Sequence, residues 1–225
     1  MRRILTLLIS LAIITPSFAV ADSPSTDIFL SSNSVVNQHQ ELSRGSALKI
    51  ITLTGHGSGT YIRIERNFYA LTARHVVDST NIVIVQSGLE AVVGEVVFKS
   101  ATQDIALIKI PALNNEHVAR IRTNRIRDLE IGEELVYSGF PSQYNTLTSG
   151  AIVSGSERGR YILQGFAWPG SSGSGIIDSR GQVRGVLVAV GLESFHGHPQ
   201  VLETVVWMEP ITDSTWAAMR RAIEL

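Results

Sequence analysis

The sequence predicts an all-β fold made of two sets of six short strands and ended by one α-helix. Short segments rich in Ile, Val and Tyr recur about every 8–12 residues with turn residues between them, a spacing typical of a β-barrel or a β-sandwich. Residues 61–65, Tyr-Ile-Arg-Ile-Glu, alternate apolar and polar side chains as a half-buried strand does. A polar stretch, residues 111–128, separates the two sets and predicts two halves joined by a connector.

The composition is that of a globular chain. Of the 225 residues, 44% are hydrophobic and 17% are charged, which leaves enough apolar material for a core. The formal net charge of −1 argues against a nucleic-acid-binding protein, which would carry a basic surplus. Cysteine is absent, which excludes disulfides, thiolate metal sites and a cysteine nucleophile. An exported protein without disulfides must be stabilised by its core alone, and this favours a bacterial source.

The N-terminus predicts a secretory signal peptide over residues 1–21. Arg2 and Arg3 precede a mostly apolar run, and Ala19-Val20-Ala21 provides an Ala-x-Ala end. Cleavage is expected after Ala21, with Ala19 as the alternative. A membrane anchor is the other interpretation, but Thr, Ser and Pro interrupt the run, and a spanning helix needs about 20 mostly apolar residues. We therefore expect export, to the periplasm first and to the extracellular space second, without stable membrane insertion after signal removal.

The remaining elements are expected in this order. Residues 22–45 form an N-terminal arm, of which residues 22–40 are rich in Ser, Asn and Asp and are expected to be loosely ordered. The first half, residues 46–125, carries strands expected at 47–54, 60–65, 68–72, 81–86, 91–99 and 105–110. The second half, residues 126–225, carries strands expected at 134–139, 146–154, 160–164, 175–178, 183–190 and 204–208.

A helix is expected from Thr212 or Asp213 to about Glu224. Either residue can cap its start, and acidic and basic residues lie at the ends that suit the helix dipole. An apolar stripe with the spacing i, i+3 and i+7 is expected to pack against the body of the domain: Trp216, Met219 and Ile223.

Peptide hydrolysis by a hydroxyl needs a nucleophile, a base, an anion that orients the base, and donors for the oxyanion. His75 is the candidate base because it directly follows an apolar strand, where its side chain can reach a cleft. Asp104 is the candidate orienting carboxylate because it begins the next apolar strand pattern. A shielded carboxylate needs a partner, and the imidazole N–H would be that partner.

Ser172 is the candidate nucleophile. It lies in Gly170-Ser171-Ser172-Gly173-Ser174-Gly175, which is framed by Trp168-Pro169 and Ile176-Ile177 and so belongs to a fold and not to a flexible linker. Glycines on both sides of Ser172 permit backbone angles that turn the N–H groups of Gly170 and Ser172 toward one point, as an oxyanion hole requires. A G-x-S-x-G elbow does not fit, because a serine occupies a required glycine position whichever serine is centred.

These segments resemble the trypsin-like (chymotrypsin-clan) serine peptidases, and among them the bacterial disulfide-free branch that includes the protease domains of HtrA and Deg proteins. The likeness covers about residues 47–190 and keeps the family order of His, Asp and Ser. The resembling segments are residues 57–60, 71–77, 104–109, 131–141, 148–154, 169–175 and 181–186. The resemblance implies a chymotrypsin-like fold of two antiparallel six-stranded β-barrels, with His75 and Asp104 on the first barrel and Ser172 on the second.

The resemblance also implies a substrate pocket. Phe166 would lie near the floor of the S1 pocket, and Val188, Ala189 and Val190 would form its wall and pair with the substrate backbone. No acidic residue is placed to bind Lys or Arg, so an apolar P1 residue is the default. Ser171 stands where zymogen-activated members carry Asp, so no activation switch of that kind is expected. Ser174 replaces a family glycine, and the short remainder of the sequence leads us to expect no PDZ module.

The leading hypothesis is an exported serine endopeptidase that acts on proteins or peptides through an acyl-enzyme. It needs no metal or organic cofactor. Two histidines in His196-Gly197-His198 without a third ligand indicate a loop tip, and not a metal site. The alternatives are a catalytically inactive binding module of the same fold and an esterase that uses the same triad. The oligomeric state is left open.

Overall fold

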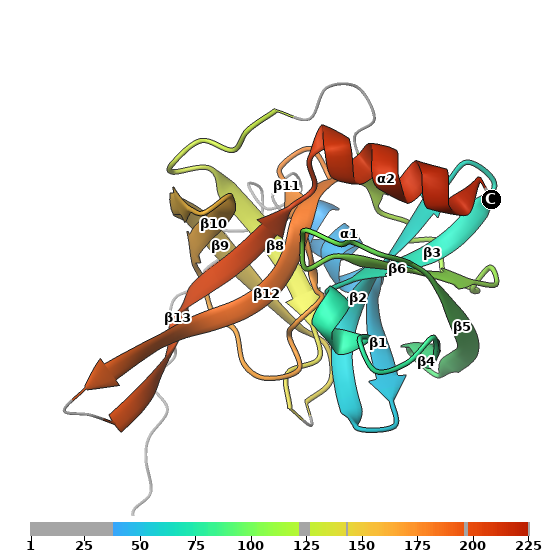
Figure 1. Cartoon of the computed structure of the whole chain (residues 1–225), viewed down its shortest axis with the longest axis horizontal. Coiled ribbons are helices and arrows are strands. Elements are labelled where there is room, and N and C mark those ends of the chain that lie inside the picture. Colours follow the sequence, from blue (N-terminus) through green and yellow to red (C-terminus); the bar gives the residue numbers. More distant parts are fainter. Residues whose placement is uncertain (1–37, 122–126, 143, 196–197, 225) are drawn as a thin grey trace, which may run out of the picture. The chain divides into compact units, whose positions relative to one another are not determined.

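The first set of strands closes into a six-stranded antiparallel barrel in the computed structural model, which describes residues 38–121, 127–142, 144–195 and 198–224 (Figure 1). The strand order is β1-β2-β3-β6-β5-β4, and β1 pairs with both β2 and β4. The strands are β1 (Ala47–Thr52), β2 (Gly55–Ile64), β3 (Asn67–Thr72), β4 (Ile82–Ser87), β5 (Glu90–Lys99) and β6 (Ala106–Ile110). Alternate residues of β1 such as Leu48 and Ile50 are fully buried and belong to the core of this barrel. The apolar residues of the alternating segment 61–65, Ile62 and Ile64, instead pack in a core that also contains residues of the second barrel.

The second set forms another antiparallel barrel in the order β11-β8-β9-β10-β13-β12, which the β11–β12 pairing closes. Its strands are β8 (Glu134–Gly139), β9 (Leu147–Glu157), β10 (Arg160–Gln164), β11 (Gly175–Asp178), β12 (Gln182–Phe195) and β13 (His198–Pro210). The predicted fold of two six-stranded antiparallel barrels with a C-terminal helix is therefore confirmed. A short strand that was not expected, β7 (Arg120–Ile121), pairs parallel to β12 at the barrel margin.

Three strand predictions were several residues too short, those for β2, β12 and β13. β2 begins at Gly55 and not at residue 60, because Gly57 and Gly59 continue the ladder with β1. β12 and β13 run beyond the barrel as a projecting two-stranded hairpin (Figure 1). Their backbone groups pair with each other there, so the ladder does not need an apolar core to continue.

A helix occupies each end of the described chain. α1 (Gln38–Gly45) includes residues 38–40, which were expected to be loosely ordered; that expectation is wrong for these three residues. The helix is anchored because buried Ser43 hydrogen-bonds Ser138 of β8 at 3.0 Å. The predicted signal peptide and the rest of the arm lie outside the described residues.

The C-terminal helix α2 (Asp213–Ile223) has Thr212 as its N-cap, and the Thr212 hydroxyl accepts the N–H of Thr215. Met219 is fully buried, and Trp216 and Ile223 pack beside it against a core that contains residues of both barrels. The predicted apolar stripe thus docks on the body. No helix within the described part of the chain combines the length and apolarity that a membrane crossing would require.

Candidate active site

His75 and Asp104 are joined by two hydrogen bonds in the first barrel. His75 lies in the single 3₁₀ turn η1 (Arg74–Val76) that follows β3, and Asp104 lies just before β6. The imidazole Nδ1 is 2.7 Å from Asp104 Oδ2, and the His75 backbone N–H donates to Oδ1 at 2.9 Å. With Nδ1 donating to the carboxylate, Nε2 is left as the proton acceptor. The pair has the arrangement of an oriented general base.

The loop that carries Asp104 is tied to the turn that carries His75. Arg74 Nη1 donates to the carbonyl of Ser100 at 2.8 Å, and the Ser100 hydroxyl accepts the N–H of Gln103 at 3.1 Å. Burial raises the pKa of Asp104, but the hydrogen bonds from the His75 ring and N–H, with the nearby charges of His75 and Arg160, outweigh burial. The net pKa lies below the ordinary value of 3.8, so Asp104 is a carboxylate at neutral pH.

Ser172 lies on a glycine-bounded loop between β10 and β11. Gly170 and Gly173 have φ values of +101° and +92°, in the region that L-residues with side chains rarely adopt. A Cβ on Gly170 would lie 2.5 Å from the Phe140 carbonyl oxygen, and one on Gly173 would lie 2.1 Å from the Ser58 carbonyl oxygen. Both positions therefore require glycine for conformation and for space.

The loop of Ser172 borders the turn of His75 across the two barrels. A Cβ on Gly57 would lie 2.7 Å from a methyl group of Val76 and 3.1 Å from the Ser172 carbonyl oxygen. A Cβ on Gly173 would lie 3.0 Å from the backbone nitrogen of Ala73. The structure thus brings together the segments that contain the three predicted residues. No hydrogen bond joins the Ser172 hydroxyl to His75 or to any other side chain or backbone group of the described residues.

Ser58 is a site residue that the sequence reasoning missed. Its buried hydroxyl donates to the Gly170 carbonyl at 2.7 Å and accepts the Phe140 N–H at 2.9 Å. Its backbone N–H donates to the Ser172 carbonyl at 2.7 Å. The Gly57-Ser58-Gly59 motif was noticed, and a serine between two glycines in a strand was the available signal.

Two backbone donors of the Ser172 loop are not used within the described chain. The N–H groups of Gly170 and Ser172 donate to no described residue, whereas the Gly173 N–H donates to Leu187 at 2.7 Å. The Pro169 carbonyl, which belongs to the same peptide unit as the Gly170 N–H, accepts the Ser142 N–H at 2.7 Å. Carbonyl and N–H point in opposite directions in a trans peptide, so this bond directs the Gly170 N–H away from Ser142.

The predicted specificity residues lie in different surroundings. Phe166 is 49% exposed and lines a cavity of about 210 Å³ together with Tyr137, Leu147 and Ser171. Residues 188–190 do not line that cavity. They follow Leu187, whose backbone bonds the Ser172 loop; Val188 is buried, and Ala189 and Val190 are partly buried. A larger apolar cleft of about 870 Å³ adjoins Phe166 and is also lined by exposed Tyr144 and Trp168.

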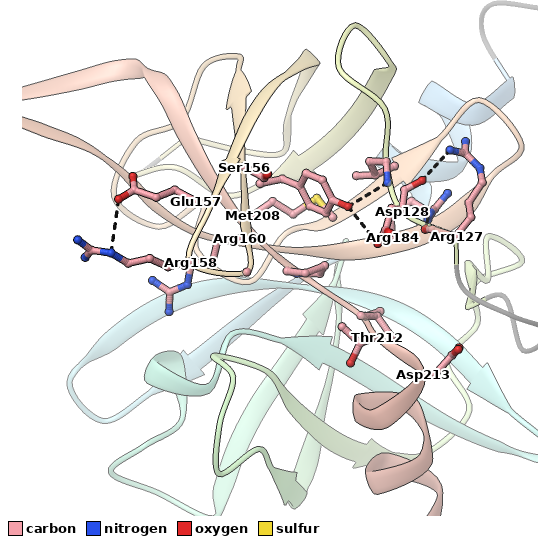
Figure 2. A pocket seen from close by; sticks show the side chains of 15 residues that line it. Arg127, Asp128, Ser156, Glu157, Arg158, Arg160, Arg184, Met208, Thr212 and Asp213 are labelled. Atoms are coloured by element: carbon pink, nitrogen blue, oxygen red, sulfur yellow. Dashed lines mark hydrogen bonds and ion pairs between the residues drawn. The ribbon is translucent and has the colours of Figure 1, made fainter.

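A further pocket of about 580 Å³ does not include the three predicted residues (Figure 2). It lies between the β9–β10 turn and the start of α2, and its lining includes Arg127, Arg158, Arg160 and Arg184. Each of these four arginines is ion-paired with a carboxylate; the partner of Arg160 is Glu209. Within the described ranges, no group of three or more His, Cys, Asp or Glu is placed to hold a metal ion; His196 lies outside those ranges.

Residues 57–186 match the family described as "Trypsin-like peptidase domain". The chain is 26% identical over 167 residues to "Serine protease Do-like HtrA" of Lactobacillus helveticus, covering 68% of this chain and 40% of the relative. It is 28% identical over 147 residues to "Probable periplasmic serine endoprotease DegP-like" of Buchnera aphidicola, covering 60% of this chain and 30% of the relative. The chain thus spans well under half the length of these curated relatives.

The fold is also similar to solved structures of serine proteases. The crystal structure of the serine endoprotease from Yersinia pestis superimposes with a TM-score of 0.67 at 23% identity, covering 84% of this chain and 66% of that one. At this identity the likeness concerns the fold. The family match extends over more than half of the chain and includes His75, Asp104 and Ser172. The chain therefore belongs to the trypsin-like peptidase domain family.

Proposed function

We propose that this protein is an exported serine endopeptidase that hydrolyses peptide bonds with His75, Asp104 and Ser172. The observation that carries the proposal is the doubly hydrogen-bonded His75–Asp104 pair beside a loop that contains Ser172 and two unused N–H donors. A base held in one tautomer, a hydroxyl and an anion-binding pair of amides are the groups that acyl transfer needs. Family membership supports the same reaction.

The reaction would proceed in two steps, acylation of Ser172 and hydrolysis of the acyl-enzyme. In acylation, Ser172 Oγ bonds the carbonyl carbon of the substrate while its proton passes to His75 Nε2. The N–H groups of Gly170 and Ser172 stabilise the oxyanion, and the carbon–nitrogen bond breaks as His75 returns the proton to the leaving amine. In deacylation, water bonds the ester carbonyl carbon while His75 takes a water proton; the carbon–oxygen bond to Ser172 then breaks, His75 returns the proton to Ser172 Oγ, and the acid product leaves.

Substrates would be proteins or peptides bound in extended form beside residues 188–190. The apolar surroundings of Phe166 support an apolar P1 residue, since that cavity has no charged lining residue. We place the enzyme in the periplasm first and outside the cell second. The signal-like N-terminus supports this, as does the name of the Buchnera relative, which describes that protein as periplasmic.

The proposal is tested by labelling the folded protein with an organophosphonate and measuring intact mass, together with cleavage of a library of quenched fluorogenic peptides. We expect one adduct per chain on Ser172, no adduct on Ser172→Ala, and cleavage by the wild type alone. A folded wild-type protein that is neither labelled nor active would refute the proposal. Subcellular fractionation and N-terminal sequencing of the mature chain would test export.

One observation favours the second candidate, an inactive binding module. The Ser172 hydroxyl makes no hydrogen bond to His75 in the described structure. Catalytic hydrogen bonds are often long before substrate binds, so we rank this candidate second. Peptide binding of equal affinity by wild type and Ser172→Ala, with cleavage by neither, would favour the module.

A further inference from the structure

A chain of hydrogen bonds leads from the Asp104 loop of the first barrel into the second barrel. Gln103 directly precedes Asp104, and its side-chain Nε2 donates to the Pro210 carbonyl at 2.9 Å and to Glu209 Oε1 at 3.2 Å. Its Oε1 accepts the hydroxyl of Thr215 in the first turn of α2. The whole amide is therefore bound by groups that follow or belong to the second barrel. Its position, and that of the adjoining Asp104, depends on them.

Glu209 is the buried charge at the centre of this chain. Its side chain is 6% exposed, and its second oxygen accepts Arg160 Nε at 2.8 Å. A buried carboxylate is costly unless it is paired, and removal of one partner leaves the other charge uncompensated. Arg160 lies opposite on β10, is 42% exposed, and lines the pocket in Figure 2. Both oxygens of Glu209 are thus bound, Oε2 by Arg160 and Oε1 by Gln103.

The two barrels must be aligned at this place for the triad to work. His75 and Asp104 belong to the first barrel, and Ser172 belongs to the second. Ser58 joins the barrels on the nucleophile side, and Gln103 joins them on the carboxylate side. We propose that Glu209 is a positioning residue: held by Arg160, it fixes Gln103 and thereby the alignment of the Asp104–His75 pair with Ser172. This inference rests on the proposed function.

The same arrangement determines the charge around the pair. On the first barrel Arg74 is neutralised by Asp78 at 3.0 Å, and the Lys99 ammonium bonds the carbonyls of residues 78 and 80. From the second barrel the charge of Arg160 acts on Asp104, and Glu209 is the ion-pair partner of Arg160. Glu209→Gln leaves Arg160 uncompensated and should move the acid limb of kcat/KM to lower pH. Arg160→Gln leaves the Glu209 carboxylate uncompensated and should move it to higher pH.

The experiment measures kcat, KM and the pH profile of the full chain on one fluorogenic peptide. We expect Glu209→Ala and Gln103→Ala each to lower kcat about tenfold, as small misplacements of reacting groups do, with KM nearly unchanged. The double variant should have a kcat no lower than that of the more impaired single variant, because both substitutions break the same chain of hydrogen bonds. Glu209→Gln keeps the shape and an acceptor for Gln103, so it tests the inference if Glu209→Ala does not fold.

The matched control is Glu133→Ala, which breaks the Arg127–Glu133 ion pair next to β8; neither residue bonds Gln103 or Asp104. A role in stability alone predicts that Glu209 and Glu133 variants lower the melting temperature while kcat stays at the wild-type level in both. That result, or acid limbs that move in the same direction for Arg160→Gln and Glu209→Gln, would overturn the inference while the wild type remains active. A wild type without activity would instead remove the proposed function, and the inference with it.

Discussion

The two barrels contribute to the candidate site in opposite ways. In the first barrel the functional groups are already engaged, since Asp104 accepts two hydrogen bonds from His75. In the second barrel they are not, since the Ser172 hydroxyl and the N–H groups of Gly170 and Ser172 have no partner among the described residues. The supporting groups are bound on both sides: Ser100 and Arg74 hold one loop, and Ser58 and Leu187 hold the other.

For the proposed reaction, this difference would combine a rigidly held base with a nucleophile and oxyanion donors that are free to bind the substrate. The base must keep one tautomer and one orientation, so its hydrogen bonds are made within the protein. The nucleophile and the oxyanion donors must bond the substrate, so a permanent internal partner would compete with catalysis. The fold meets both needs by fixing the backbone around Ser172 and leaving its own donors unused.

The largest expected effect comes from removing the unengaged hydroxyl. Ser172→Ala should lower kcat by roughly five to six orders of magnitude, because the proposed acyl-enzyme forms on the Ser172 oxygen. Peptide binding should remain, since the alanine changes neither the loop nor the cleft. Fluorogenic cleavage measures the loss, and fluorescence anisotropy of a bound peptide measures retention. Undiminished cleavage would show that the free hydroxyl of this comparison is not the nucleophile.

Breaking the engaged half should cost less. Asp104→Asn should lower kcat about 10⁴-fold, because the amide stabilises the wrong tautomer of His75 and does not stabilise the imidazolium. Initial rates of cleavage of the same fluorogenic peptide measure kcat. Asp78→Asn is the control, since it removes a neighbouring exposed carboxylate that bonds Arg74 and not His75. An equal decrease of kcat in the two variants would mean that the loss of a negative charge, and not the loss of the hydrogen bond to His75, lowers kcat.

The support of the nucleophile loop can be tested next. Ser58→Ala removes the donor to the Gly170 carbonyl and the acceptor of the Phe140 N–H, and should lower kcat about ten- to a hundredfold by loosening the oxyanion donors. Ser43→Ala removes another buried serine hydrogen bond between elements, the one to Ser138, which does not involve the Ser172 loop, and should leave kcat near that of the wild type. If both variants lose stability but neither loses kcat, Ser58 is only a packing residue.

The smallest expected effect concerns acid stability. The pKa of Asp104 is lowered in the folded state, so its contribution to stability is fully present above the unfolded pKa, near 3.8. It is lost as the pH falls through the folded value. Urea unfolding of wild type and Asp104→Asn should therefore differ at pH 7 and converge in strongly acidic solution. A stability difference that is constant with pH would contradict the stated direction of the shift.

The sequence predicted what depends on short-range pattern. Strand cores such as residues 68–72 and 134–139 carry clear apolar periods, and the predicted C-terminal helix follows from a capping Thr212 and an apolar stripe. Resemblance supplied the order of the barrels, because barrel closure depends on pairings such as β1–β4 between strands that are distant in sequence. No local pattern contains that information.

The residues that support the site were harder to predict. Ser58, Gln103 and Glu209 are ordinary polar residues in the sequence. Their partners are distant: the Gln103–Glu209 bond spans 106 positions and the Ser58–Gly170 bond spans 112. Arg160 and Glu209 face each other only because β10 and β13 are neighbours. The S1 prediction likewise depended on loops whose shape the sequence does not encode locally, and it stays a prediction.

The two terminal helices have a consequence for unfolding. α1 precedes the first barrel but packs on β8, β9 and β11 of the second, and α2 follows the second barrel but contacts β5 of the first. Each barrel is therefore contacted by a helix that is joined in sequence to the other barrel. Unfolding of either barrel would remove the surface on which the helix adjoining the other barrel packs. We therefore expect both barrels of this cysteine-free chain to unfold in one cooperative transition.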